Sequence, residues 1–572
     1  MNFRVWAPLA PRMDLAIHGE RVPMEPQERG WWTATVDAVA GDYYGFSIDG
    51  GEALPDPRSP WQPLGVHGLS RLVDHSAFEW SDKDWRGTDV TGGVIYELHV
   101  GTFTEEGTFD SAIEKLDHLV DLGVTAVELM PVAEFPGDRG WGYDGVDLFA
   151  PHHAYGGPEG LKRLVDACHR RGLAAILDVV YNHLGPDGNY LGRFGPYFSD
   201  KYRTPWGDAI NLDGPDSSEV RDHLIENALM WLEDYHFDAL RIDAVHAIFD
   251  QSALHFLEEL TERVEELKNR LGRVLWVIAE NDLNDPRIVT PRGSGGYGVT
   301  AQWSDDLHHA LHAVLTGERS GYYSDFGALS QVAKALRAAY VYDGVYSEFR
   351  RRRHGRPVGD LPGHRFLGYM QNHDQVGNRA LGERLSHLVT EDLLKVASAI
   401  VLTAPFVPML FQGEEWGATT PFCYFTDHHD EELALAVTEG RRREFESFGW
   451  VADSIPDPQA VETFEMSMLN WRERDEPLHR DLIEWHRDLI ALRRETPELS
   501  DGRRDLVDVA CDDDAGWLMM TRGPITVAIN VSDSVVTVPV PGGDVVLTSA
   551  EAPEVGDGEA RLGPESVTIF RA

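Results

Sequence analysis

The sequence is poor in cysteine and in long apolar runs. Its 572 residues include three cysteines, Cys168, Cys423 and Cys511, with no C-x-x-C pair. This spacing predicts reduced, mostly buried thiols rather than a disulfide framework. No apolar run approaches the roughly 20 residues that a membrane-spanning helix needs, and the N-terminus lacks the charged and apolar regions of a signal peptide. We therefore expect a cytoplasmic protein with no membrane contact.

Basic residues are also scarce. Lysine and arginine number 51 against 95 aspartates and glutamates, which gives a formal net charge of −44 at pH 7. Nucleic-acid binding needs a basic surface, and adhesion to anionic membranes needs basic clusters. We expect neither a nucleic acid nor a membrane as a partner. An acidic excess of this kind mainly keeps a protein surface solvated.

The length predicts two or three domains, because 572 residues exceed an ordinary single domain. Residues 1–88 contain short strand-like runs separated by glycine and proline, which predicts an N-terminal β-sandwich like a carbohydrate-binding module. Trp31 and Trp32 in this part would either stack on sugar or, as burial statistics favour, pack in the core or between domains. Short strand-like runs return in residues 499–572 and predict a second small β-domain.

Between these ends, residues 89–498 alternate strands with helices. Amphipathic runs such as 109–122, 158–171, 218–235 and 482–496 accompany eight strand-like runs, at 94–100, 124–130, 173–180, 239–245, 274–279, 299–303, 366–371 and 407–411. This alternation implies parallel βαβ units, and eight such units close a (β/α)8 TIM barrel, an α/β fold. A long Gly-, Pro- and Tyr-rich insertion spans about 182–217, and loops of this length are usually functional.

A charged pair stands at the end of the fourth strand-like run. Arg241 and Asp243 lie two residues apart among apolar neighbours, so both side chains project from one face of the strand. By itself this pair would be either a structural salt bridge or part of a site. Asp178, Glu280 and Asp374 end the third, fifth and seventh runs in a similar way. Carboxylates at the C-terminal ends of several strands are how such a barrel builds an active site.

Signatures of several other sites are missing. The chain has no G-x-S-x-G nucleophile elbow and no H-E-x-x-H zinc motif. His308, His309 and His312 fall on one predicted helix, but no second ligand cluster accompanies them, so we interpret them as interior or surface histidines. A G-x-G-x-x-G match at 293–298 precedes a strand rather than a helix, which excludes a dinucleotide site. We expect no cofactor and no metal at the site, and leave open a Ca²⁺ ion near Asn182.

The four carboxylate-bearing segments resemble the four signature regions of the α-amylase family of retaining glycoside hydrolases, in the same order. They read LDVVYNH at 177–183, ALRIDAVH at 239–246, IAEND at 278–282 and QNHDQ at 371–375. The resemblance implies that Asp243 is the nucleophile and Glu280 the general acid/base. It implies that Asp374 grips sugar hydroxyls and supports the transition state.

The same resemblance implies further substrate-binding residues. His183 and His373 would hydrogen-bond the sugar before the cleaved bond, and Tyr143, in the segment GWGYD, would stack on that sugar. Asp178 would order the site rather than react.

The chemistry of retention agrees with this division of roles. A retaining hydrolase needs one ionised carboxylate and one protonated carboxyl. Arg241 would keep Asp243 ionised, whereas Glu280 has no basic neighbour in its own strand.

Within the family, several segments favour the maltooligosyltrehalose trehalohydrolases. The segments are 206–211, 279–287, 302–323 and 371–379, and the opening FRVWAP is similar to the N-terminal module of branching enzymes, debranching enzymes and this group. This resemblance implies hydrolysis of the α-1,4 bond next to the terminal trehalose of maltooligosyl trehalose, in trehalose biosynthesis, beside a synthase that makes the trehalosyl end. The alternatives are a 1,4-α-glucan branching enzyme, which is a transferase, and a catalytically inactive glycan-binding relative.

Preference for a trehalose end would come from the leaving-side sugars, because the 1,1 linkage bends the terminal glucose away from the path of maltose. Buried polar groups that fit the bent sugar would be left unpaired by maltose. We expect such groups on the loops after the fourth to sixth strands, where each candidate could instead be a solvated loop residue. The candidates are His246, Asn281, Asp282, Asp305 and Asp306.

Overall fold

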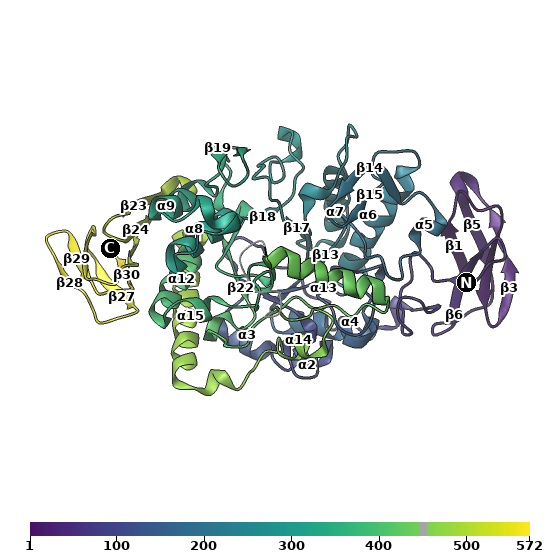
Figure 1. The fold of residues 1–572 in the computed structure, drawn as a ribbon, viewed down its shortest axis with the longest axis horizontal. Helices are drawn as coiled ribbons and strands as arrows, with labels where there is room; N and C mark the ends of the chain where they lie inside the picture. The colour runs from purple at the N-terminus through teal and green to yellow at the C-terminus, as the bar shows by residue number, and fades with distance from the viewer. Residues whose placement is uncertain (447–454) are drawn as a thin grey trace.

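The computed structural model describes residues 1–446 and 455–572; residues 447–454, inside the predicted barrel range, lie outside the described residues. The chain forms an elongated molecule in which a barrel and its helices lie between two strand-rich ends (Figure 1). The first strands of the chain stand at one end of the long axis and the last strands at the other.

Two antiparallel sheets form the N-terminal end, as the strand-like runs predicted. Apolar side chains such as Val5, Leu15 and Phe46 are buried in it. One sheet has the order β1 (Asn2–Trp6), β5 (Trp31–Thr35), β4 (Glu25–Pro26). The other has the order β3 (Glu20–Pro23), β2 (Met13–Ile17), β6 (Tyr43–Ile48), β7 (Ala53–Leu54), with β8 (Ser70–Arg71) also paired to β6.

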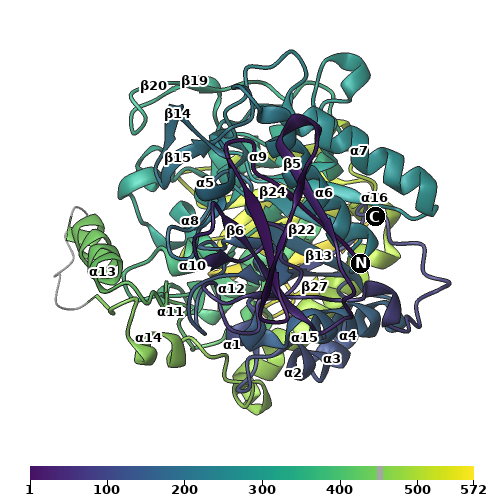
Figure 2. The ribbon, with the colours of Figure 1, turned by 90° about the vertical axis from the view of Figure 1, so that its right-hand side faces the viewer.

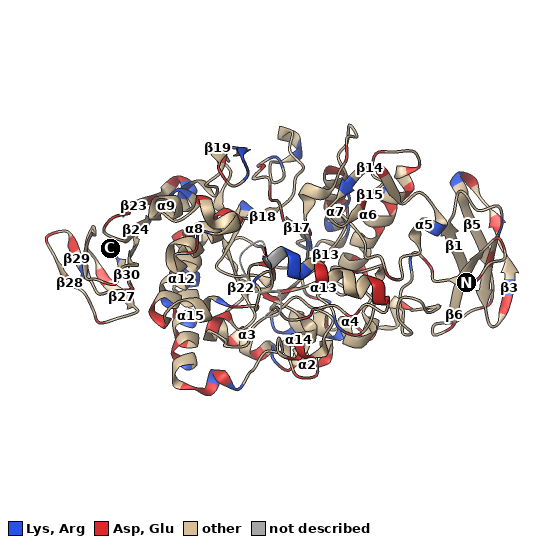
Figure 3. Ribbon diagram, viewed as in Figure 1, with Lys and Arg blue, Asp and Glu red and all other residues tan. Residues whose placement is uncertain are grey.

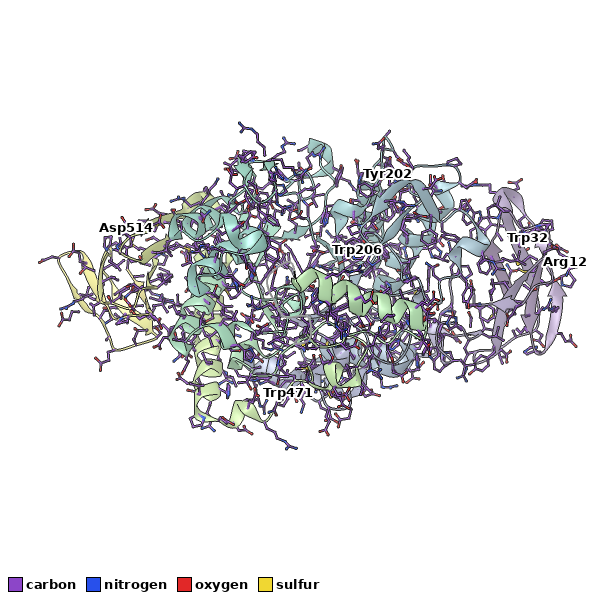
Figure 4. The ribbon with its side chains drawn as sticks, viewed as in Figure 1. Arg12, Trp32, Tyr202, Trp206, Trp471 and Asp514 are labelled. Atoms are coloured by element: carbon purple, nitrogen blue, oxygen red, sulfur yellow. The ribbon has the colours of Figure 1, made fainter. Side chains whose placement is uncertain are left out.

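Trp31 and Trp32 serve packing in this part of the chain. The Trp31 side chain is buried, and its indole N–H donates to Glu219 on α6 (Ser217–Glu233), a helix of the barrel, at 3.1 Å. The indole N–H of Trp32, which Figure 4 shows among the N-terminal strands, donates to the carbonyl oxygen of Ala7 at 3.1 Å. The interpretation as core and interdomain residues is confirmed.

Eight parallel strands close into a barrel, as predicted from the alternation of strands and helices. The observed strands match the predicted runs or are shorter at one or both ends. Around the barrel the order is β9 (Ile95–Leu98), β10 (Ala126–Leu129), β13 (Ala174–Val179), β16 (Ala239–Ile242), β17 (Trp276–Ala279), β18 (Ala301–Trp303), β21 (Phe366–Tyr369) and β22 (Val407–Phe411), which pairs again with β9.

Side chains of each strand alternate between the barrel interior and the surrounding helices. In β16, Ala239 belongs to the same interior cluster as Ile176 of β13, whereas Leu240 and Ile242 belong to the core that the helices cover. Arg241, two residues after Ala239, therefore points into the barrel. This alternation brings its charge to the inner side of the carboxyl ends of the strands.

Helices cover the outside of the barrel. The predicted helix 109–122 is two helices, α2 (Phe109–Ile113) and α3 (Leu116–Leu122), because the backbone N–H groups of Glu114 and Lys115 bond three residues back rather than four. The others around the barrel include α4 (Gly157–Arg170), α6, α7 (Phe256–Leu271), α8 (Asp305–Thr316), α9 (Leu329–Ala338), α12 (Glu391–Thr403) and α15 (Pro477–Glu495).

Several excursions leave the barrel on its carboxyl side. The insertion at about 182–217 contains α5 (Leu191–Phe194) and a hairpin of β14 (Phe198–Thr204) and β15 (Gly207–Ile210), which its composition did not predict. A second hairpin pairs β19 (Asp343–Ser347) with β20 (Arg352–Gly355). Figures 1 and 2 both show these two hairpins on the same side of the molecule. Further additions are the short helices α10 (His373–Gly377), α11 (Leu385–Leu388) and α14 (Val461–Glu465) and the longer α13 (Glu431–Glu446).

The C-terminal end is a second β-domain, as predicted. A five-stranded sheet has the order β23 (Val507–Asp512), β24 (Trp517–Arg522), β25 (Ile525–Asn530), β30 (Ser566–Arg571), β27 (Asp544–Thr548). A three-stranded sheet has the order β26 (Val536–Pro539), β29 (Glu559–Leu562), β28 (Glu554–Gly556).

Charge and cysteine follow the pattern expected from composition. Figure 3 shows acidic residues spread over the helices and both ends rather than gathered on one element. Cys168 and Cys423 are buried and Cys511 is half-buried, and none of the three forms a disulfide. In the described part of the chain, no helix is both long and apolar enough to span a bilayer.

Candidate active site

A cavity of about 740 Å³ opens at the carboxyl end of the barrel strands. Arg241 and His373 lie beneath its surface, where both are almost fully buried. Asn281 and Asp306 are absent from its lining. The predicted site residues that line the cavity are Tyr143, His183, Asp243, His246, Glu280, Asp282, Asp305 and Asp374.

Arg241 joins three carboxylates below the cavity. Its Nη1 donates to Asp178 Oδ2 at 2.7 Å and to Asp243 Oδ1 at 2.8 Å, and its Nη2 donates to Glu280 Oε2 at 2.8 Å. The guanidinium carbon lies 4.1 Å from the centre of the Trp303 ring. Hydrogen bonds from a charged donor are stronger than neutral ones, so this one cation fixes the positions of three carboxyl groups.

Asp243 follows β16 directly and is held through both carboxylate oxygens. Arg241 binds Oδ1, and the side-chain amide of Asn182 donates to Oδ2 at 2.6 Å and to the Asp243 carbonyl oxygen at 3.0 Å. The Asp243 side chain is 10% exposed, so it is both oriented and reachable. The side-chain amide oxygen of Asn182 lies 2.5 Å from His183 Nδ1, so Asn182 links the Asp243 carboxylate to His183.

Glu280 follows β17, and its surroundings differ from the expectation drawn from its own strand. Ile242 and Ala279 are paired across β16 and β17, which brings Arg241 against Glu280 from the neighbouring strand. Burial raises the pKa of Glu280, and the Arg241 charge opposes this rise while the Asp243 carboxylate adds to it. No described residue hydrogen-bonds Oε1 of Glu280, which leaves that oxygen for a ligand.

A strained residue completes the contact to Glu280. The backbone of Ala244 lies in the left-handed region, with φ of 37°, which is uncommon for a residue other than glycine. In this conformation its N–H donates to Glu280 Oε2 at 2.9 Å. Strain of this type persists where the surrounding structure enforces it, often at functional sites.

Tyr143 and His373 form a stacked pair beside these carboxylates. Their ring centroids are 5.2 Å apart, and the Tyr143 hydroxyl lies 2.7 Å from His373 Nε2 and donates to Asp178 Oδ2 at 2.5 Å. Burial favours a lower pKa for His373, but the carboxylates of Asp374 and of Glu97, 2.6 Å from Nδ1, raise its pKa to about 9. The imidazole is therefore charged at neutral pH.

Asp374 does not end β21 but lies in the first turn of the short helix α10. The side chain of Asn372 caps this helix by accepting the N–H of Gln375 at 2.9 Å. Asp374 lines the cavity, its side chain is 34% exposed, and its Oδ1 accepts the amide of Asn378 at 3.1 Å. It is the most accessible carboxylate of the three proposed catalytic residues.

Trp206 is a cavity residue that we did not single out from the sequence. It stands at the turn between β14 and β15, is 50% exposed, and stacks on His183 with ring centroids 4.7 Å apart. Figure 4 shows Trp206 near the middle of the molecule, away from both ends. Its segment, 206–211, carried part of the family resemblance, which was the available signal.

Three of the predicted leaving-side residues line the cavity. Asp282 pairs with Arg350 from the β19–β20 hairpin, whose Nη1 donates to Oδ2 at 2.8 Å, and its backbone N–H approaches His246 Nδ1 at 3.4 Å. Asp305 accepts a hydrogen bond from the Tyr369 hydroxyl, and burial raises the pKa of Asp305 to about 7. Arg350, like Trp206, lines the cavity and was not predicted.

The other two predicted residues point elsewhere. Asp306 Oδ2 accepts hydrogen bonds from the Asn284 amide and from the backbone N–H groups of Val341 and Tyr342 at 2.9, 2.6 and 2.7 Å, so Asp306 holds a loop in place. Asn281 is buried, and its Nδ2 lies 3.4 Å from Oε1 of Gln302 on β18. Asp305 and Asp306 begin α8 rather than lying on a loop, and successive helical residues face different directions.

The clusters of described side chains that could hold a metal ion do not include the catalytic carboxylates. His308, His309 and His312 are buried on α8, as interpreted from the sequence, and His309 also lines the cavity. Two clusters could hold an ion, and neither includes Asp243, Glu280 or Asp374. They are His67, Asp187, His429 and Glu134, His152, His153.

A (β/α)8 barrel whose strand ends carry carboxylates organised by one buried arginine defines a glycoside hydrolase of the α-amylase type. Comparison with known proteins agrees. Residues 76–203 match the family described as "Alpha amylase, catalytic domain", and residues 503–569 match a domain of unknown function, DUF3459. A crystal structure of a candidate alpha amylase from Salmonella typhimurium superposes with a TM-score of 0.93 at 38% identity and covers 100% of this chain and 97% of that one.

Relatives of similar sequence show which group within the family this chain belongs to. A malto-oligosyltrehalose trehalohydrolase from Mycobacterium tuberculosis is 50% identical over 100% of this chain and 99% of its own length. A 1,4-alpha-glucan branching enzyme from Corynebacterium jeikeium is 29% identical over 73% of this chain and 61% of its own length. The chain belongs to the α-amylase family and, within it, to the malto-oligosyltrehalose trehalohydrolases.

Proposed function

We propose that this protein hydrolyses the α-1,4 bond next to the terminal trehalose of maltooligosyl trehalose. It releases trehalose and a shorter maltooligosaccharide, with retention of configuration. The observation that carries this proposal is the convergence of Asp243, Glu280 and Asp374 on one cavity, in a chain of this family. A synthase that makes the trehalosyl end would supply the substrate.

Asp243 acts as the nucleophile. Its ionised carboxylate attacks the anomeric carbon of the sugar before the cleaved bond and forms a covalent glycosyl-enzyme intermediate. Hydrogen bonds to both oxygens, from Arg241 and Asn182, support this role because they fix the attacking group and stabilise its charge.

Glu280 acts as the general acid and then as the general base. Its pKa is raised by burial, so it keeps a proton to give to the leaving oxygen. Once it has lost that proton, Glu280 takes one from the water that cleaves the intermediate. The nearby Arg241 and Ala244 N–H bind Oε2, which leaves Oε1 for the proton that is transferred.

The remaining residues bind the sugar. Asp374 accepts hydrogen bonds from sugar hydroxyls, and its accessible position at the cavity supports this role. Tyr143 offers an aromatic face on which a sugar ring can stack. His183 lines the cavity and donates a hydrogen bond beside them, whereas the charged His373 lies beneath the cavity surface and holds the Tyr143 hydroxyl. On the leaving side, His246, Asp282 and Asp305 are the candidates that recognise the bent trehalose unit, since they line the cavity.

Digestion of maltooligosyl trehalose, followed by chromatography, tests the proposal. We expect trehalose and the maltooligosaccharide as products, and proton NMR should show the new reducing end first as the α anomer. Release of maltose units from unmodified chains at the same rate would leave a general amylase. New α-1,6 branches would identify a branching enzyme, and binding without turnover would identify an inactive relative.

A further inference from the structure

Three side chains of types that can bind a metal ion come from distant parts of the chain and lie close together outside the catalytic cavity. His67 lies on the loop between β7 and β8, Asp187 on the loop after β13, and His429 on the segment before α13. One ligand atom from each side chain lies within 4.8 Å of the other two, and His67 Nε2 is 3.0 Å from Asp187 Oδ1. The loops therefore bring two imidazoles and one carboxylate together.

We propose that His67, Asp187 and His429 bind one divalent transition-metal ion of the zinc class. Two imidazoles and a carboxylate are ligands that Zn²⁺ accepts, with water in the fourth position. Bonds of about 2.0–2.1 Å in a tetrahedron place ligand atoms roughly 3.3 Å apart. The present separations, up to 4.8 Å, require only small side-chain rotations to reach that geometry.

The surroundings of the three ligands suit a metal ion. The Nδ1 atom of His67 lies 2.8 Å from the Tyr190 hydroxyl, and a metal-bound histidine usually hydrogen-bonds through its other nitrogen. Asp187 Oδ2 accepts the backbone N–H of His429 at 3.2 Å, which directs Oδ1 toward His67. No described residue hydrogen-bonds the His429 ring, whose centroid lies 6.5 Å from that of His67.

Charge also favours a cation at this position. The Asp187 side chain is 8% exposed, and no lysine or arginine of the described residues pairs with it. A protein with a net charge of −44 attracts cations to its surface. A charged His67 would satisfy Asp187 Oδ1 without an ion, but that pair leaves the His429 ring without a hydrogen-bond partner among the described residues.

An ion at this site would connect three parts of the fold. His67 belongs to the N-terminal sandwich, and Asp187 lies on the same loop as the cavity residue His183. His429 adjoins His428, whose Nε2 lies 3.7 Å from Asp144, another cavity residue. Metal binding should therefore stabilise the carboxyl side of the barrel against unfolding.

Isothermal titration of the chelator-treated full-length protein with Zn²⁺ tests the site. We expect one equivalent to bind and the melting temperature to rise with added Zn²⁺. His429→Ala should weaken binding by at least about 10- to 100-fold, since loss of even an outer partner costs that much. This variant should fold normally, because no described residue hydrogen-bonds the His429 ring. Asp187→Asn should weaken binding in the same way.

A matched control comes from His18, which is 2.9 Å from Asp42 on the surface and has no third ligand beside it in the described residues. His18→Ala should leave Zn²⁺ affinity unchanged. Substituted Co²⁺ should give the visible spectrum of a low-coordinate ion with two nitrogen ligands, and His429→Ala should change it. Absence of Zn²⁺ binding would overturn the proposal. Binding that survives both His429→Ala and Asp187→Asn but disappears in Glu134→Gln would assign the ion to the other cluster.

Discussion

Replacing Arg241 with methionine should destabilise the protein in a way that depends on pH. The change removes hydrogen bonds to Asp178 at 2.7 Å and to Asp243 and Glu280 at 2.8 Å, and leaves three buried carboxyl groups close together. Removing one partner of a buried ion pair typically costs about 3–5 kcal/mol in the free energy of unfolding. We expect a loss of this order at neutral pH.

The loss should be larger at high pH. Even beside Arg241, burial raises the pKa of Asp178 to about 7 and raises the pKa of Glu280, and Arg241 opposes both shifts. Without the guanidinium, both pKa values should rise further. A carboxyl group whose pKa is higher in the folded state makes stability fall as pH rises from its unfolded pKa, about 4, through its folded pKa. For Asp178, the difference in stability between variant and wild type should therefore grow as the pH rises from about 7, where the wild-type carboxyl ionises, toward the higher pKa of this group in the variant.

Thermal or denaturant unfolding at several pH values measures this difference. Arg493→Met is a matched control, because Arg493 is also buried and donates three hydrogen bonds, but to the carbonyl oxygens of Leu402, Ala404 and Phe406. The control should lose a similar amount of stability at every pH. If the loss in Arg241→Met is equally independent of pH, Arg241 does not neutralise the site carboxylates.

Three further predictions concern the proposed chemistry. Asp243→Asn should keep the fold and bind sugar but lower kcat by several orders of magnitude, the scale of losing a covalent nucleophile; near wild-type turnover would contradict this. Glu280→Gln should remove the alkaline limb from the bell-shaped pH profile of kcat/KM, because activity falls as Glu280 loses its proton through its raised pKa. An unchanged limb would belong to another group. Trp206→Ala should raise KM by about 10-fold, equivalent to about 1.4 kcal/mol of binding free energy, with a smaller effect on kcat; an unaltered KM would mean that no sugar contacts this ring.

The barrel and the carboxylate positions could be predicted because each rests on a local pattern. Eight apolar runs separated by amphipathic ones predict parallel strands, and charged residues directly after a run mark its carboxyl end. Asp243 and Glu280 follow their strands immediately, as that pattern requires. Asp374 follows its strand only after a short turn, because a helix begins at His373.

Other features depend on contacts that a linear pattern does not contain. The pairing of β16 with β17 brings Arg241 against Glu280, and periodicity along either strand says nothing of that approach. The β14–β15 hairpin lacks the apolar alternation that predicts strands, so the sequence did not predict that Trp206 lies at a turn beside the cavity. The directions of Asn281 and Asp306 are set by partners on other segments, such as Asn284 for Asp306.

The most direct test of the proposed function compares kcat/KM on maltopentaosyl trehalose with kcat/KM on a maltooligosaccharide of equal length. Both substrates carry ordinary α-1,4 bonds, so only the leaving-side sugars differ. If polar groups of the cavity recognise the bent trehalose unit, the trehalose-ended chain should be preferred, by up to roughly 10⁴-fold. Equal values on the two substrates would contradict the proposed specificity.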